Sequence, residues 1–231
     1  MQEFCLQKIA IWNCFPELSF EHWDVKSAFT NAPIEETIYV HQVPGFERQG
    51  SEGKVLLLKK ALYGTKQAAR AWQVFLSKIF LDLGATIHLK DDCVYIFRDG
   101  DAFLIIGTHV DDIFSLFNSK GKALRDKVMG VLRSKMEIED KGKLSFALDI
   151  RIQRNVQEGI VKLSQRQYIE GLIKDYNITG VRTSPAPVDD LTEEDLPKTD
   201  TEKEEASKIP IRILIGRLWW LSQRDQIFFA V

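Results

Sequence analysis

The sequence is poor in the residues that mark several protein classes. It has three cysteines and four histidines in 231 residues. They are too few and too scattered for a disulfide framework or for the paired spacing of a zinc site. Charged residues interrupt its apolar stretches before they reach the ~20 residues that a membrane-spanning helix needs. We therefore expect reduced thiols, as in an intracellular protein, and neither a membrane span nor a signal peptide.

The sequence also lacks a strong excess of either charge. Its formal net charge is −2, from 31 basic and 33 acidic residues. This balance argues against a strongly basic nucleic-acid-binding protein. The acids are concentrated in residues 189–205, however, so the remainder is net basic. The whole-chain charge therefore does not exclude a nucleic-acid partner.

The stretch that most strongly indicates a chemical function is FLIIGTHVDDIFSLFN, residues 103–118. Two carboxylates, Asp111 and Asp112, separate two short apolar arms, a pattern that predicts a β-hairpin. Burying two like charges is costly unless a cation compensates, and Mg²⁺ prefers such oxygen ligands. The pair is thus a candidate metal site. The alternative is an ordinary solvated turn, which is how we interpret Asp91–Asp92 and Asp189–Asp190.

The sequence predicts two further elements before this hairpin, a strand and a helix. Alternation over residues 18–24 predicts a strand that ends at Asp24. The strongest helical pattern lies within residues 59–84, with Thr65 as N-cap and Gly84 as C-terminal stop. Its apolar stripe predicts core packing of Ala68, Trp72, Phe75, Leu76, Ile79, Phe80 and Leu83.

The entry to this helix is basic and contains a glycine. Gly64 is accompanied by Lys59, Lys60, Lys66 and Arg70. Backbone amides and the helix dipole at such an entry can hold a phosphate. A solvated helix start is the alternative, because no multi-glycine loop is present.

The remaining pattern completes an α+β layout with helices on one face of an antiparallel sheet. We expect strands at 93–97 and 103–109, then a helix that Ser119 caps and that runs to about 136, then a hairpin within 144–163 and a helix after Ser164. If the strand of Asp24 lies beside the acidic hairpin, three carboxylates converge. Three could hold two divalent cations for phosphoryl or nucleotidyl transfer.

Several colinear motifs carry a family resemblance: DVKSAFTNAPIEETIYVHQVPGF, LKKALYGTKQAARAW, HVDD, LSQRQYI, SPAPVD and KIPIRILIGRLWWL. Together they resemble the reverse transcriptase of copia-type (Ty1-like) retrotransposons over nearly the whole chain. The resemblance implies a right-hand polymerase palm with partial fingers over residues 1–183. It implies an acidic linker at 184–206 and the start of a thumb or connection region at 207–231.

The resemblance also implies roles for individual residues. Asp24, Asp111 and Asp112 match the catalytic aspartates, which with the backbone carbonyl of Val25 would hold two Mg²⁺ ions, replaceable by Mn²⁺. Phe29 matches the aromatic residue that excludes a ribose 2′-hydroxyl. The residues that would contact the incoming nucleotide are Phe29, Tyr63, Gly64, Lys66 and Gln67. Those that would contact nucleic acid are Lys59, Lys60, Arg70 and His109.

The sequence departs from the family pattern at three positions: His109 replaces the tyrosine of the Tyr-Val-Asp-Asp box, Ala69 a proline and Ala147 a glycine. Upstream finger strands, RNase H and integrase regions have no counterpart, so we expect a truncated copy. The implied function is RNA-directed DNA synthesis on a primer–template with deoxynucleoside triphosphates. The protein would be intracellular, in the cytoplasm within the family's particles or in the nucleus. The alternatives are a non-catalytic remnant that binds nucleic acid and an unrelated two-metal nuclease.

Overall fold

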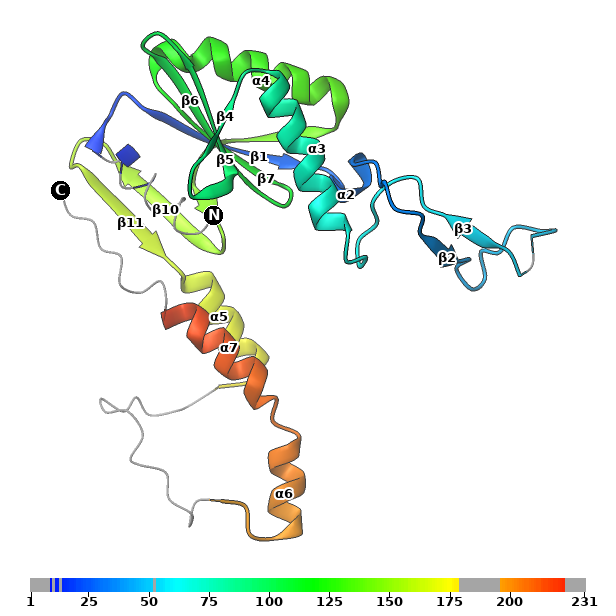
Figure 1. The fold of residues 1–231 in the computed structure, drawn as a ribbon. Helices are drawn as coiled ribbons and strands as arrows, with labels where there is room; N and C mark the ends of the chain where they lie inside the picture. The colour runs from blue at the N-terminus through cyan, green and yellow to red at the C-terminus, as the bar shows by residue number, and fades with distance from the viewer. Residues whose placement is uncertain (1–8, 10, 13, 52, 179–195, 223–231) are drawn as a thin grey trace. The chain divides into compact units, whose positions relative to one another are not determined.

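The computed structural model describes residues 9–222, apart from 10, 13, 52 and 179–195 (Figure 1). The described residues divide into two compact units, one within 9–145 together with 154–160 and the other within 146–153 and 161–222. The Asp189–Asp190 pair and the first part of the predicted linker lie outside the described residues.

The first unit contains a six-stranded sheet in the order β4-β5-β6-β7-β1-β8, with neighbouring strands antiparallel. The strands are β1 (Ser19–Val25), β4 (Thr86–His88), β5 (Asp91–Asp99), β6 (Ala102–His109), β7 (Asp112–Phe117) and β8 (Ile138–Lys143). This order places β1, which carries Asp24, between β8 and β7, the strand that begins at Asp112. The antiparallel sheet confirms the α+β prediction.

Helices α3 (Ala68–Asp82) and α4 (Lys122–Lys135) cover one face of this sheet. Trp23 and Val25 of β1 point toward them and belong to the same buried cluster as the α3 side chains. The predicted α3 stripe is confirmed: Trp72, Leu76 and Phe80 are buried. Because side chains alternate along a strand, Asp24, between Trp23 and Val25, belongs to the opposite face.

Two predicted helix caps are wrong. α3 begins after Gln67, because residues 62–65 form a turn in which Gly64 has φ +89° and the Thr65 hydroxyl donates to the carbonyl of Leu62. A short 3₁₀ helix η1 (Ser119–Gly121) precedes α4, and Asn118, not Ser119, caps it by accepting from the Gly121 amide at 2.8 Å. The Thr65 hydroxyl thus bonds locally within the turn and does not cap α3. Gly84, with φ +93°, ends α3 as predicted.

Between β1 and α3 lie three short elements: α2 (Ala28–Asn31), β2 (Tyr39–His41) and β3 (Val55–Leu57). β2 and β3 form a separate antiparallel hairpin with largely exposed apolar side chains. The chain returns from it to the end of α2, where the Ala61 amide donates to the carbonyl of Ala32 at 3.0 Å. This return brings the segment ahead of α3 next to the segment after β1.

The described part of the second unit contains three helices and most of a three-stranded sheet in the order β11-β10-β9, although residues 154–160, between the bulk of β10 and that of β11, are assigned to the first unit. Its elements are β9 (Phe146–Ala147), β10 (Ile150–Asn155), β11 (Ile160–Ser164), α5 (Arg166–Asp175), α6 (Asp200–Ser207) and α7 (Ile211–Ser222). The predicted hairpin before α5 is confirmed. Part of the predicted linker forms α6, which has a Thr199 capping box and no buried residue. No helix among the described residues has the length and apolar character to cross a membrane.

Candidate active site

The acidic hairpin has the predicted form. His109 and Asp112 are paired at the ends of β6 and β7, and Val110 and Asp111 form the turn between them. Asp111 is exposed and Asp112 is partly buried. One carboxylate therefore lies in the turn and the other at the start of a strand.

The sheet register brings Asp24 to this hairpin. Asp24 of β1 is paired with Asp112 on one side and with Glu139 of β8 on the other. Cα atoms of such antiparallel partners are about 4.5–5.5 Å apart, and their side chains share one face. Because Trp23 and Val25 face the helices, this row of His109, Asp112, Asp24 and Glu139 lies on the face away from α3 and α4.

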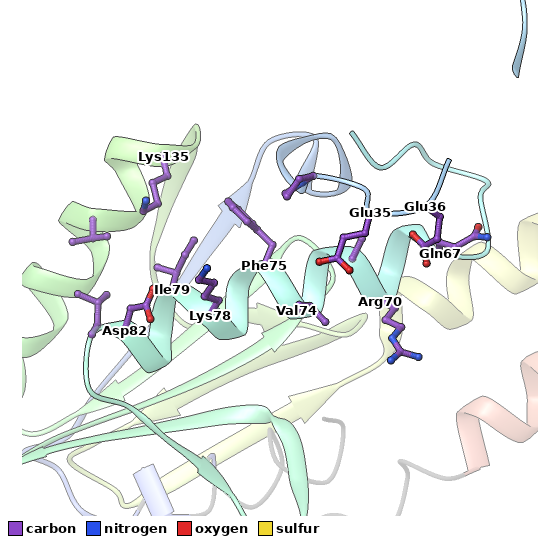
Figure 2. A pocket seen from close by; sticks show the side chains of 14 residues that line it. Glu35, Glu36, Gln67, Arg70, Val74, Phe75, Lys78, Ile79, Asp82 and Lys135 are labelled. Carbon is purple, nitrogen blue, oxygen red and sulfur yellow. The ribbon is translucent and has the colours of Figure 1, made fainter. Parts of the chain in front are cut away.

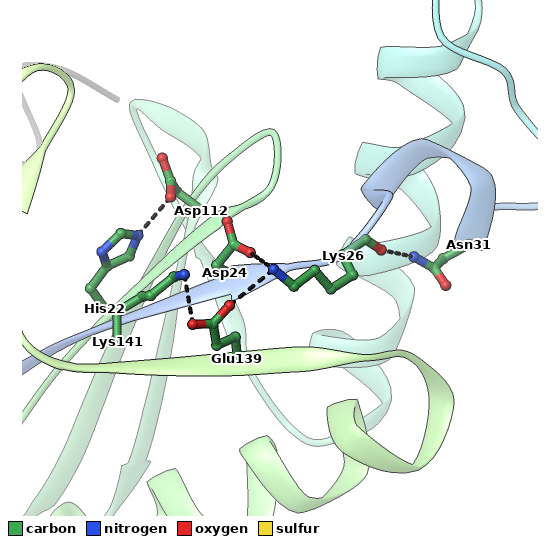
Figure 3. Close-up of polar contacts among 7 residues, drawn as sticks. All are labelled: His22, Asp24, Lys26, Asn31, Asp112, Glu139 and Lys141. Atoms are coloured by element: carbon green, nitrogen blue, oxygen red, sulfur yellow. Dashed lines mark hydrogen bonds and ion pairs between the residues drawn. The ribbon is translucent and has the colours of Figure 1, made fainter.

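Each of the two facing aspartates has a nitrogen partner (Figure 3). The Asp112 Oδ1 is 2.6 Å from the Nε2 of His22, whose ring stacks on Phe114 with centroids 5.0 Å apart. The Asp24 Oδ2 is 3.5 Å from the ammonium of Lys26. Like charges on neighbouring strands repel, so these partners stabilise the pairing of two carboxylates.

Glu139 extends this network on β8. Its carboxylate is 2.9 Å from Lys141 and 2.9 Å from Lys26. Hydrogen bonds from Lys141 and Lys26 lower the pKa of Glu139 to about 2. The bond to Glu139, followed by its charge and that of Asp24, raises the pKa of Lys26. Lys26 thus stays a cation shared between the central aspartate and its neighbour.

The donor chemistry of the site fits a divalent cation. Carboxylate oxygens are the ligands that Mg²⁺ prefers. The side chains of Asp24 and Asp112 are 25% and 28% exposed, which leaves them accessible. However, within the part of the chain that the structure describes, no three His, Cys, Asp or Glu side chains are grouped closely enough to hold a metal ion. The sheet register thus aligns two carboxylates, and the third lies in the adjacent turn.

Two hydrogen bonds from outside the hairpin hold this turn. The Val25 amide donates to the carbonyl of Asp111 at 2.7 Å. The indole Nε1 of Trp72, on α3, donates to the carbonyl of Val110 at 2.5 Å. Val110 has φ +55°, a conformation that is unfavourable for a β-branched residue. The turn that carries Asp111 is therefore fixed from both β1 and α3.

The expected nucleotide-contacting residues form a second group. The rings of Phe29 and Tyr63 are in contact, with centroids 4.5 Å apart. Phe29 also packs against the core, whereas Tyr63 and Gly64 are exposed. The segment that enters α3 is held there by the backbone bond between Ala61 and Ala32. The structure thus brings Phe29 and Tyr63 together, close in sequence to Asp24 and to α3 respectively.

The basic residues that we expect to contact nucleic acid or nucleotide lie at the surface. Lys59, Lys60, Lys66 and Arg70 are all exposed. Arg70 and Gln67 line a cavity of about 770 Å³ whose wall also includes residues of α3 and α4 (Figure 2). That cavity belongs to the helix-covered face of the sheet, whereas Asp24 and Asp112 lie on the opposite face.

Sequence reasoning missed several residues of the site. His22 could have been found, because strand alternation over residues 18–24 places it on the face of Asp24. Lys26 lies just beyond that strand. Glu139 and Lys141 reach the site only through the pairing of β1 with β8, and Trp72 was interpreted solely as a core residue. No local pattern marks these three.

Comparison with known proteins adds an independent finding. Residues 9–190 match the family described as reverse transcriptase (RNA-dependent DNA polymerase). The Retrovirus-related Pol polyprotein from transposon TNT 1-94 of Nicotiana tabacum is 32% identical over 221 residues, which is 93% of this chain and 16% of that protein. The corresponding polyprotein from transposon RE1 of Arabidopsis thaliana is 31% identical over 71% of this chain and 11% of its own length.

A yeast protein is also similar. The putative transposon Ty5-1 protein YCL074W of Saccharomyces cerevisiae is 27% identical over 71% of this chain and 53% of its own length. This chain therefore spans only a small part of the two plant polyproteins and about half of the yeast protein.

Proposed function

The chain belongs to the reverse transcriptase family of Ty1/copia-type retrotransposons, and we propose that it is an RNA-directed DNA polymerase domain that extends a primer by nucleotidyl transfer. The observation that supports this activity is the register of the sheet. Asp24 and Asp112 are direct partners on neighbouring strands, and Asp111 occupies the adjoining turn. A strand and a hairpin more than 80 residues apart thus supply the carboxylates.

We assign the six-stranded sheet with α3 and α4 to the polymerase palm. In this proposal Asp24, Asp111 and Asp112, with the carbonyl of Val25, would hold two Mg²⁺ ions, or Mn²⁺ in their place. When bound, such ions stabilise the attacking and leaving oxygens of an in-line transfer. The protein's own contribution is to fix the carboxylates, since the chemistry requires little from acid–base side chains. His22 and Lys26 orient two of the three.

The pair of Phe29 and Tyr63 would form the wall beside the incoming deoxynucleotide. Its contact, with centroids 4.5 Å apart, limits the movement of the Phe29 ring, as a 2′-hydroxyl filter requires. Gly64, Lys66 and Gln67 would contact the same nucleotide. The exposed cations Lys59, Lys60 and Arg70, with His109 beside the carboxylates, would contact the primer–template.

The other regions follow from the same family membership. The β2–β3 hairpin would belong to the fingers, and α7 to the start of the thumb or connection region, after a linker over 184–206. Like the polymerases that it resembles, the protein would act inside the cell.

The test is primer extension on poly(rA)/oligo(dT) with Mg²⁺ or Mn²⁺, with an Asp111→Asn, Asp112→Asn double variant as control. The amide keeps the size of each side chain and removes its charge. Extension by the parent and none by a folded double variant would establish the activity. If a folded parent binds the duplex but extends nothing, the chain is a non-catalytic binding remnant. Duplex cleavage without extension would favour a two-metal nuclease.

A further inference from the structure

The turn between β6 and β7 has a backbone that needs external support. Val110 occupies the left-handed region at φ +55°, although its branched side chain disfavours that conformation. Val110 is also 41% exposed, so packing of its own side chain contributes little to holding the turn. The conformation therefore depends on bonds made to the turn by other elements.

Those bonds come from two sides. β1 supplies the Val25 amide, which donates to the Asp111 carbonyl. α3 supplies the Trp72 indole, which donates to the Val110 carbonyl and is only 3% exposed. A buried indole N–H without a partner is costly, so the two groups constrain each other. Phe75, with its ring centroid 6.0 Å from that of Trp72, borders the indole on the same helix.

We infer that Trp72 is a positioning residue for the catalytic turn. It acts on this turn through the backbone carbonyl of Val110. Its hydrogen bond fixes the Val110–Asp111 peptide, and so the direction from which Asp111 leaves the backbone. This inference rests on the proposed polymerase function, because only then is the placement of Asp111 relative to Asp24 and Asp112 a catalytic quantity.

The arrangement has a functional consequence. α3 follows directly on the segment of Tyr63 and Gly64, which packs on Phe29 through the Tyr63 ring. The same helix therefore connects the expected nucleotide wall with the turn that carries Asp111. A rigid helix between the two would keep the distance from nucleotide to carboxylate constant.

The chain contains a matched control. Trp12 is also buried, at 6% exposed, and its Nε1 also donates to a backbone carbonyl, that of Leu18, at 2.9 Å. Trp12→Phe and Trp72→Phe each remove one indole N–H from one backbone carbonyl. Both substitutions should lower the melting temperature by a few degrees, since each removes one hydrogen bond from an indole N–H to a backbone carbonyl, of 2.5 Å at Trp72 and 2.9 Å at Trp12.

The experiment compares the two variants in steady-state primer extension and in amide hydrogen exchange. Trp72→Phe should lower kcat by roughly tenfold or more while KM for dTTP changes by less than about threefold, because misplacing a catalytic group affects the transition state more than ground-state binding. It should also speed exchange of the Val25 amide by about tenfold, since the acceptor of that amide is the Asp111 carbonyl. Trp12→Phe should change neither quantity.

Equal behaviour of the two variants in kcat and in Val25 exchange would overturn the inference and leave Trp72 as a core residue. If the parent has no polymerase activity, the proposed function fails, yet the exchange measurement still decides whether Trp72 holds the turn. If Trp72→Phe does not fold, Trp72→Met replaces it, because this flexible apolar side chain can fill the buried space and also has no N–H to donate to the Val110 carbonyl. A folded Trp72→Met protein with unchanged Val25 exchange would then contradict the inference.

Discussion

Gly121, at the end of η1, is a position where a single methyl group should destabilise the fold. A Cβ there would lie 2.1 Å from the carbonyl oxygen of Phe103 and 3.0 Å from the Oδ1 of Asn118. The first of these atoms belongs to the backbone of β6, which is paired along its length with β5 and β7. It cannot rotate away as a flexible side chain could.

The magnitude follows from the displacement required. Cβ contacts under 3.0 Å are essentially never found, so Gly121→Ala must separate η1 from β6 by about 1 Å. Overpacking of this kind costs about 1–3 kcal/mol. The movement would also weaken the bonds that Asn118 Oδ1 accepts from the Gly121 amide at 2.8 Å and from the Phe103 amide at 3.3 Å, worth about 1 kcal/mol. We expect a loss of about 2–4 kcal/mol, a large share of the ~5–15 kcal/mol that stabilise a typical domain.

Gly130 provides the control for this prediction. It lies exposed within α4, nine residues further along the chain, and a Cβ there would meet nothing within 4 Å. Gly130→Ala should therefore stabilise the protein by about 0.5–1 kcal/mol through helix propensity alone. Urea unfolding followed by tryptophan fluorescence measures both changes. A Gly121→Ala protein as stable as its parent, or a shift of the same sign for both variants, would refute the reasoning.

Three further predictions concern the same unit. Leu76→Ala, at the contact of α3 with the sheet, should cost about 3–5 kcal/mol in urea unfolding because it opens a cavity in a fully packed cluster. Arg125→Leu should destabilise the protein more than the Arg125→Leu, Glu21→Leu double variant does, because the single change leaves the part-buried Glu21 carboxylate without Arg125. The order of the two melting temperatures tests this. The pKa of Glu139 is lowered to about 2, so its pairing with Lys141 stabilises the fold above about pH 4.5 and is lost as pH falls toward 2. The urea midpoint of Glu139→Gln should therefore lie below the parent's at pH 7 and converge with it near pH 2, by a small and salt-sensitive amount because the pair is exposed.

The elements with a strong local signal could be predicted from the sequence. The acidic hairpin, the strand to Asp24, the α3 stripe and the end of α3 at Gly84 all depend on periodicity or on a glycine that no other residue replaces easily. The two caps could not, because Thr65, Ser119 and Asn118 all offer suitable oxygens. Tertiary neighbours decide which of these oxygens forms the capping hydrogen bond. One such neighbour is the Phe103 amide, which also donates to Asn118.

The candidate site divides in the same way. The candidate carboxylates could be found by motif, because Asp24, Asp111 and Asp112 lie in stretches that match the family pattern. Their partners could not, because they are determined by strand order: Glu139 follows Asp24 by 115 positions and meets it only because β8 pairs with β1. Trp72 reaches Val110 across 38 positions, from a helix whose pattern indicates nothing but core packing.

The same strand explains why core and site are inseparable in this fold. β1 alternates between Trp23 and Val25, which are buried under the helices, and His22 and Asp24, which face away from them. A slip of β1 by one residue would exchange the two sets, exposing Trp23 and burying Asp24. Exposing Trp23 alone would cost on the order of 3 kcal/mol, and burying an unpaired carboxylate would cost more. The hydrophobic side of β1 therefore fixes the register that pairs Asp24 with Asp112, so the packing of α3 and α4 sets the geometry of carboxylates that neither helix touches.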